Sequence, residues 1–361
     1  MTPLKRGHDM YQALFSIGLI VIAAGVSGCS TMPLSDGGKA NCAAATIAHL
    51  PQCVEGRFGI VLASGAPEEE LAAISGAADA GVLLWERYFG GTPPRASVVL
   101  GDITDAELAR LQAAGFQAIL PWRSRAMFMD DIGAQVRAQL AEKLAGQPQE
   151  VLDRAYAAAM AQAEEKITGR SAASLPVPHE LGHLWLKVVY WQGAPDDGVR
   201  RYGTPAADWL DEAAALLMED ETYVASRYAQ LRELDAQGSL IPLAQLVSME
   251  HPLFRPAQDL VSEGGGTTST TVRILTGEEA ALLAQQTSAG SFYAQIRAFA
   301  DFLIAQSEEE RIFAVIAKAE AGGTSFPDWL AEHGEAFGLA GDMDLLEVTF
   351  LTWLHLKLVS G

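Results

Sequence analysis

The chain carries little positive charge and few cysteines. Its 361 residues include 25 lysines and arginines against 45 acidic residues, which gives a formal net charge of -20. No run of lysine or arginine occurs. Because nucleic-acid binding needs a basic face, this composition argues against a nucleic-acid partner. There are three cysteines, no Gly-x-Ser-x-Gly segment and no internal repeat, so neither a serine-hydrolase elbow nor a repeat architecture is indicated.

Long apolar runs are also scarce, and the longest lies near the start of the chain. Residues 13–26 are apolar, Lys5 and Arg6 precede them, and the small residues Ser27 and Gly28 follow. This order is typical of an export signal, and the run is too short to favour a membrane-spanning helix. We therefore expect residues 1–28 to be a signal peptide.

The end of this signal contains a cysteine. The segment Val-Ser-Gly-Cys, ending at Cys29, resembles the lipobox of bacterial lipoproteins, in which the cysteine becomes the lipidated first residue. The alternative is an ordinary signal peptide that happens to contain a cysteine. Under the lipoprotein interpretation, Ser30 favours an outer-membrane anchor that faces the periplasm.

The other two cysteines lie close together in a segment rich in small residues. Residues 29–56 have the composition of a flexible tether followed by a short loop. Because export leads to an oxidising compartment, we expect Cys42 and Cys53 to form a disulfide that closes a short loop; two free, inert thiols are the alternative.

The fold expected is α+β: a small mixed β-sheet with helices, followed by a mainly α-helical part. Residues 57–131 have the pattern of a small α/β subdomain, with strands expected at 58–63, 96–100 and 116–120 and a fourth at 126–129. Strand signals nearly vanish after residue 130, so residues 132–361 should be helical. Helices are expected at 67–89, 104–115, 132–145, 148–168, 207–220, 222–235, 277–288, 291–306, 308–320, 325–333 and 342–358. Capping boxes are expected at Thr104/Glu107, Thr276/Glu279 and Ser307/Glu310, and the glycine triplet at 264–266 reads as a mobile loop.

One further helix carries the chemistry. The segment from Pro178 to Trp191 is almost wholly apolar after His183, as in a helix buried on all sides. His179 and His183 are four residues apart and share one helical face, so both can approach one metal ion. Glu180 is adjacent, and the three residues form the HExxH pattern of zinc metallopeptidases. The pattern alone is only moderately specific, because it also arises by chance.

A third ligand is expected downstream. The segment from Trp209 to Ala215 places Glu212 before a run of alanines, and small residues let two helices approach closely. It resembles the Trp-x-x-Glu-(Gly/Ala)-x-Ala segment of gluzincins, and this resemblance implies that Glu212 is the third zinc ligand. Asp208 and Asp211 are rivals, with Asp208 placed to act as a partner behind the ligands. A solvated acid in the first helical turn is the alternative for Glu212.

A weaker resemblance concerns Tyr293. The segment that begins at Ser291 is similar to the Tyr-x-(Lys/Gln) segment of aminopeptidase-like and peptidase-MA-like gluzincins, which implies that the Tyr293 hydroxyl stabilises an oxyanion. A tyrosine packed in the core is the alternative. His49, His251, His333 and His355 show no ligand spacing and read as structural or surface groups.

Together these patterns predict a lipid-anchored, gluzincin-type zinc peptidase with one Zn²⁺, in which Glu180 is the general base on a zinc-bound water. A non-catalytic envelope lipoprotein that uses this fold to bind a partner, and an enzyme of another class with the same metal ligands, are the alternatives. Two features depart from the family. Pro178 directly precedes the first ligand, and Leu216 stands where an acid one turn after Glu212 would orient a histidine.

Overall fold

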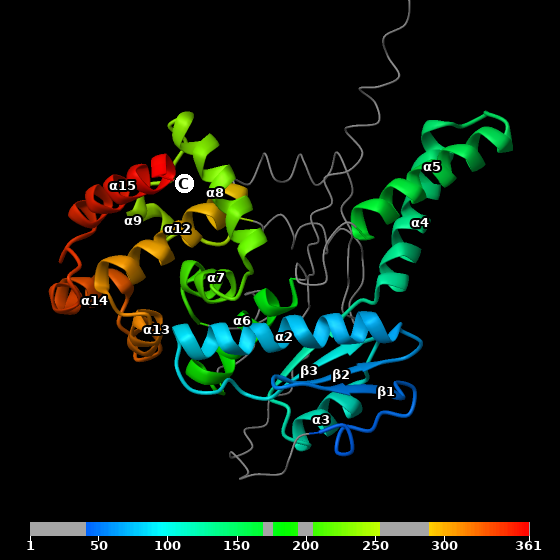
Figure 1. The fold of residues 1–361 in the computed structure, drawn as a ribbon, viewed down its shortest axis with the longest axis horizontal. Coiled ribbons are helices and arrows are strands. Elements are labelled where there is room, and N and C mark those ends of the chain that lie inside the picture. Colours follow the sequence, from blue (N-terminus) through cyan, green and yellow to red (C-terminus); the bar gives the residue numbers. More distant parts are fainter. Residues whose placement is uncertain (1–40, 169–175, 194–204, 253–288, 361) are drawn as a thin grey trace, which may run out of the picture.

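The computed structural model describes residues 41–168, 176–193, 205–252 and 289–360 (Figure 1). The expected signal peptide, the lipidation site Cys29, the helix at 277–288, the capping box at Thr276 and the glycine triplet lie outside these residues. Within them, no helix is both long enough and apolar enough to cross a membrane.

A four-stranded mixed sheet forms one side of the molecule. Its strands lie in chain order, with β1 antiparallel to β2 and the following pairs parallel. The strands are β1 (Gln52–Glu55), β2 (Gly59–Ala63), β3 (Ala96–Leu100) and β4 (Ala118–Trp122). The strands expected at 58–63, 96–100 and 116–120 are confirmed within two residues. Strand β1 was not expected, because it falls in the segment interpreted as a tether and loop.

Two helices sandwich this sheet. Val61 and Ala63 of β2 belong to the core shared with α2 (Glu68–Tyr88), whereas Ile60 and Leu62 face the smaller core that includes Leu111 of α3 (Asp105–Ala113). This alternation follows from the two-residue period of a strand. Helix α3 starts at the expected Thr104 capping box. The Thr104 hydroxyl accepts a hydrogen bond from the Glu107 backbone N–H, and the Glu107 carboxylate accepts one from the Thr104 backbone N–H.

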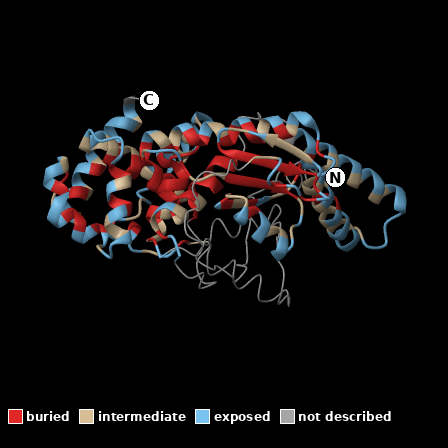
Figure 2. Ribbon diagram, turned by 90° about the horizontal axis from the view of Figure 1, so that it is seen from below, coloured by how far each residue is buried: buried red, intermediate tan, exposed pale blue. Residues whose placement is uncertain are grey.

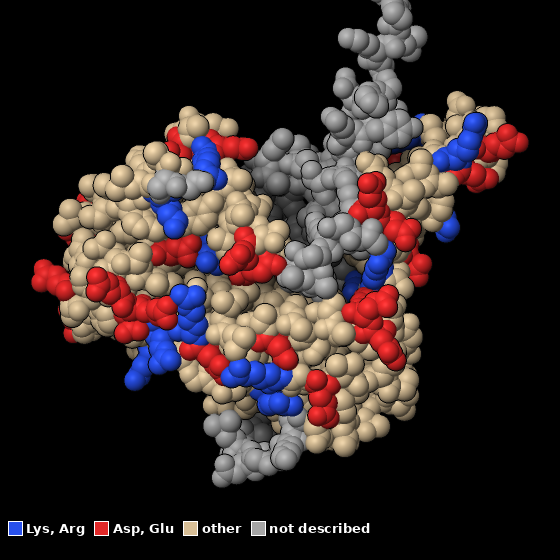
Figure 3. Space-filling model, in the orientation of Figure 1, with Lys and Arg blue, Asp and Glu red and all other residues tan. Residues whose placement is uncertain are grey.

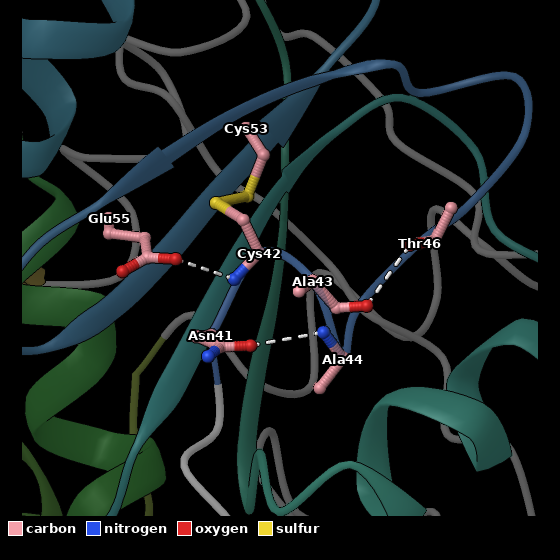
Figure 4. Close-up of a disulfide and its surroundings, with 7 residues drawn as sticks. All are labelled: Asn41, Cys42, Ala43, Ala44, Thr46, Cys53 and Glu55. Carbon is pink, nitrogen blue, oxygen red and sulfur yellow. Dashed lines mark hydrogen bonds between the residues drawn. A yellow bond between two sulfur atoms is a disulfide. The ribbon is translucent and has the colours of Figure 1, made fainter.

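The expected disulfide is present. Cys42 and Cys53 are bonded, and Cys53 lies on strand β1 (Figure 4). The Cys42 backbone N–H also donates to Glu55 Oε1 at 2.9 Å, so Cys42 is bound to β1 at two positions, Cys53 and Glu55. The segment expected to be a tether and loop therefore ends as an ordered edge of the sheet.

The fourth strand expected, at 126–129, is wrong. These residues lie in α4 (Arg125–Lys143), which begins where the Ser124 hydroxyl accepts a hydrogen bond from the Met127 backbone N–H. Ser124 is thus an N-cap, and a short apolar run does not by itself distinguish helix from strand. Helix α4 pairs with α5 (Gln149–Thr168) in a hairpin that projects from the body (Figures 1 and 2). The domain boundary expected at residue 131 falls inside α4.

The remaining helices build the other side of the molecule. They are α6 (Val177–Tyr190), α7 (Asp208–Leu216), α8 (Glu221–Ala236), α9 (Leu243–Leu246), α12 (Ala289–Ser307), α13 (Ile312–Ala321), α14 (Phe326–His333), the 3₁₀ turn η2 (Gly334–Phe337) and α15 (Met343–Ser360). The coarse prediction of an α+β molecule with a helical second part is confirmed. One core runs without interruption from the sheet, through α2 and α6, into these helices (Figure 2).

The capping box expected at Ser307 and Glu310 is wrong. Ser307 is the last residue of α12, and its hydroxyl donates back to the Leu303 carbonyl oxygen at 2.6 Å. Glu308 then takes a positive φ of 54°, so the chain turns before α13 begins at Ile312. A Ser-x-x-Glu pattern here marks the end of one helix and the connection to the next.

Candidate metal centre

Helix α6 holds the two histidines in the interior. It begins at Val177, with Pro178 in its first turn, where proline's missing N–H costs no hydrogen bond. His179, Glu180 and His183 are all buried, and the two imidazole rings lie with their centroids 5.1 Å apart. Two imidazoles one helical turn apart thus present ring nitrogens on one face, as the sequence predicts.

The opposite side of α6 is fixed against α2 and the sheet. A Cβ added at Gly81 of α2 would lie 3.0 Å from Pro178 Cβ, so the glycine allows close contact at the first turn of α6. Further along, Trp185 Nε1 donates to the Pro94 carbonyl oxygen at 3.0 Å, and its ring meets Trp85 edge-on. The proline that departs from the expected pattern is therefore a packing residue at the start of α6.

Helix α7 approaches the histidine face of α6 very closely. A Cβ at Gly182 would lie 2.8 Å from the Ala214 carbonyl oxygen and 2.8 Å from Ala215 Cα. No larger residue fits there without moving a backbone. Gly182 of the HExxH segment thus packs directly against the alanines that follow Glu212. This contact explains why small residues occur at both positions.

This close approach brings Glu212 to the two histidines. Glu212 Oε2 lies 3.7 Å from His179 Nε2 and 3.8 Å from His183 Nε2. One ligand atom from each of the three residues lies within 4.8 Å of the others, and all three side chains are buried. His179, His183 and Glu212 are therefore a group that could hold a metal ion.

Two carboxylates stand behind the histidines. Asp211 Oδ2 lies 2.9 Å from His183 Nδ1, and Glu219 Oε1 lies 3.2 Å from His179 Nδ1. Each histidine thus has its far nitrogen beside an acid and its near nitrogen toward Glu212. Such partners fix the tautomer and the ring orientation of ligating histidines. Asp211 and Glu219 thus orient the histidines. The sequence alone predicts this role for Asp208 and offers no acid for it at Leu216.

The buried acids are held in their charged forms by their neighbours. Burial raises the pKa of Glu219, but the contacts with His179 and Arg227 outweigh this effect and lower the pKa to about 2. Arg227 Nη2 lies 2.7 Å from Glu219 Oε1. For Glu212, burial also raises the pKa, and the nearby charges of His183, His251 and His179 outweigh this, so its pKa is lowered. Both carboxylates are acceptors suited to cationic or metal-bound partners.

A third histidine lies at the centre. His251 Nε2 is 3.2 Å from Glu212 Oε1 and 2.9 Å from the Tyr293 hydroxyl. The backbone N–H of His251 donates to Asp208 Oδ2 at 2.6 Å. Asp208, expected behind the ligands, thus anchors the chain at His251. Tyr293 lies beside the histidines, its ring centroid 6.5 Å from that of His179, and Arg227 lies over its face.

Both ends of α7 are fastened by buried or half-buried charged groups. At the start, the Ala207 N–H donates to Glu320 Oε2 at 3.2 Å, and burial raises the pKa of Glu320. At the end, Arg297 Nη1 donates to the Leu216 carbonyl oxygen at 2.6 Å. A short helix leaves backbone groups unsatisfied at both termini. These contacts fix the helix that presents Glu212.

The structure thus brings together every metal ligand expected from the sequence and places Tyr293 beside them, while Glu180 is buried next to His179 in α6. It adds Glu219, Arg227 and His251, and it places Asp211, a rival for the third ligand, beside His183 Nδ1 instead. His251 was interpreted as a structural or surface histidine; it is not a surface group, because its side chain is buried against Glu212. Glu219 lies beyond the end of α7 at Leu216, so no spacing within that helix marks it. No local spacing marks His251.

Comparison of the chain with protein-family models, with curated proteins and with solved structures finds no match in any of the three. The function must therefore be argued from the geometry of the site.

Proposed function

We propose that the protein is a zinc-dependent peptidase of gluzincin type, anchored by a lipid on Cys29 in the bacterial cell envelope. One observation carries the proposal. His179 and His183 of α6 and Glu212 of α7, which are far apart in the sequence, converge in the interior with their ligand atoms within 4.8 Å of one another. Burying such groups is costly unless a partner satisfies them.

The donor set fits zinc. Two imidazole nitrogens and one carboxylate oxygen are the ligands of catalytic zinc sites, which use three protein ligands and keep an open position. The acids Asp211 and Glu219 beside the histidine Nδ1 atoms complete the arrangement that favours metal binding at Nε2. Bound there, zinc would lower the pKa of water and polarise a carbonyl oxygen.

Glu180 is the proposed general base. It follows the first ligand in α6, is buried, and is rotated by about a hundred degrees from His179 around the helix, so it neighbours the site without sharing the ligand face. Its carboxylate accepts a proton from the attacking water and passes it to the leaving amine. General base catalysis of this kind contributes about 10²- to 10⁴-fold.

Tyr293 is the proposed donor to the developing oxyanion. His251 lies within hydrogen-bond distance of its hydroxyl, and the Arg227 guanidinium lies 5.1 Å from its ring centroid. These contacts hold the phenol in one place beside the ligand set. A donor that is already oriented stabilises negative charge without reorganising during the reaction.

The envelope location is supported by the N-terminal segment and by the disulfide. Lys5, Arg6 and the apolar run lead to Cys29, and the bonded pair Cys42–Cys53 is typical of an oxidising compartment. Ser30 favours the outer membrane, with the protein facing the periplasm. Peptides or proteins of that compartment would be the substrates. Replacement of Cys29 by serine should release the protein from the membrane fraction.

The test uses the detergent-purified full-length protein and its Glu180→Gln variant. Metal analysis should find about one zinc per chain in both. A peptide-library digest should show cleavage by the unaltered protein and a loss of about 10²-fold or more in Glu180→Gln. Glu221→Gln, at the exposed start of α8, is the matched control and should cleave normally.

Two results would contradict the proposal. A metal-free protein would remove its basis. A protein that holds zinc but cleaves no peptide would favour the non-catalytic alternative, an envelope lipoprotein in which zinc has a structural role.

A further inference from the structure

A pocket of about 340 Å³ adjoins the metal centre, and His179 forms part of its wall. One side is α2, which contributes only small or apolar residues: Ala72, Ala73, Gly76, Ala77, Ala80 and Leu84. The other side is formed by the first turn of α6 and by the segment that joins α7 to α8. The volume lies within the range of small-molecule sites, which is about 300 to 1,000 Å³.

The charged residues on the wall already have partners within the protein. Glu219 contacts His179 and Arg227, and Asp220 caps α8 by accepting hydrogen bonds from the Thr222 and Tyr223 backbone N–H groups. Because both carboxylates interact with groups of the protein itself, the wall does not favour a cationic ligand. The α2 side offers methyl and methylene groups alone. The lining favours an apolar occupant over a charged one.

We infer that this pocket is a specificity subsite that takes one branched or aromatic apolar side chain of the peptide substrate. The inference rests on the proposed function and adds the substrate class to it. The shared wall is the reason for this assignment. His179 presents Nε2 to Glu212 and lines the pocket, so a substrate held at the metal centre has the pocket directly beside it.

Gly76 provides a direct way to fill the pocket. A Cβ added there meets no atom within 4 Å, and the residue lies within α2 without a positive φ. Replacing this exposed helical glycine should also favour the helix, since glycine is a poor helix former. Gly76→Leu therefore places a side chain in the pocket without disturbing the backbone. Gly341→Leu is the matched control, because that position is equally open and lies just before α15.

The experiment measures binding of metal-chelating probes by calorimetry to the zinc-loaded full-length protein. The probes are the hydroxamates of glycine, alanine, leucine and phenylalanine, which share the chelating group and differ in the side chain. Each buried methylene group should tighten binding about four-fold, so the leucine and phenylalanine probes should bind at least about ten-fold more tightly than the glycine probe.

Gly76→Leu should abolish this preference and leave the affinity for glycine hydroxamate within about three-fold of the original. Gly341→Leu should keep the full preference. If all probes bind equally to the unaltered protein, or if Gly76→Leu keeps the preference, the subsite is refuted while the metal site stands. If no probe binds, the zinc has no open position for a substrate, and the proposed function fails together with the subsite.

Discussion

The sheet side and the helical side of the molecule differ in the polar groups that they bury. In the sheet, α2 and the turn before α4, the buried polar side chains among the described residues are three serines, Ser75, Ser97 and Ser124. The helical side buries eight polar or charged groups, all of them in α6, α7, α12 or the connections after α7: His179, Glu180, His183, Glu212, Glu219, His251, Gln295 and Arg297.

We interpret this difference as one between residues that stabilise the fold and residues that serve function. A protein does not need buried charges to fold, and an apolar replacement of a buried charge pair is often as stable. The sheet side follows that rule, because its charged residues pair at the surface: Arg57 pairs with Glu86, and Arg87 of α2 pairs with Glu310 of the helical side. Basic and acidic side chains lie next to one another on the face seen in Figure 3. On the helical side, five of the eight buried polar groups contact one another around one point: His179, His183, Glu212, Glu219 and His251. Such a concentration is typical of a functional site.

The largest effect on stability is expected from Arg297→Met. Arg297 donates to the Leu216 carbonyl oxygen and pairs with Asp301 at 3.1 Å while it is nearly buried. Its loss removes the donor at the end of α7 and leaves Asp301 with fewer partners, which should cost about 3 kcal/mol in the free energy of unfolding. Urea denaturation provides the measurement.

Arg87→Met is the matched control from the other side. Arg87 pairs with Glu310 at 2.7 Å, but both side chains are more than half exposed. Because water screens such a pair, the change should cost less than about 1 kcal/mol. Equal losses for the two arginines would remove the proposed contrast between the two sides.

A smaller effect is expected from Asp211→Asn. Asp211 Oδ2 lies 2.9 Å from His183 Nδ1, and an amide there would hold the histidine less well. Zinc affinity should fall about 10- to 100-fold, as measured by competition with a chelator of known affinity. Glu221→Gln serves again as the exposed acid control. An unchanged affinity in Asp211→Asn would show that Asp211 does not orient the ligand.

The smallest effect is expected from Ser97→Ala on strand β3. Ser97 is fully buried, and its hydroxyl has no hydrogen-bond partner in the described part of the chain. Removing an unsatisfied hydroxyl should leave the free energy of unfolding unchanged or raise it by up to about 1 kcal/mol. A loss of stability in urea denaturation would reveal a role for this hydroxyl and make the sheet side less simple than it looks.

The same contrast explains how much the sequence could predict. Local patterns identified α6, α7 and the ligands, because His179 and His183 lie one helical turn apart and the alanines beside Glu212 signal close packing. The capping box at Thr104 and the strands β2 to β4 were equally local. Strand β1 could not be recognised, because Gln52–Glu55 has no apolar run and becomes a strand only by pairing with β2.

The groups around the ligands depend instead on the path of the chain. Helix α7 ends at Leu216, so Glu219 reaches His179 from a turn rather than from the helix. His251 lies in a connection far along the chain from both ligand helices, and its backbone N–H donates a hydrogen bond to the Asp208 carboxylate. Neither position follows from spacing within one helix. The local patterns therefore supplied the ligands, whereas tertiary contacts supplied their surroundings.

The most direct test of the account is the zinc content of Glu212→Ala compared with that of the unaltered protein and of Glu180→Gln, measured by elemental analysis after purification under identical conditions. The account predicts about one zinc per chain in the unaltered protein and in Glu180→Gln, and almost none in Glu212→Ala, although the variant remains folded by circular dichroism. Equal zinc content in folded Glu212→Ala, or no zinc in any of the three proteins, would contradict the convergence of α6 and α7 on a metal ion.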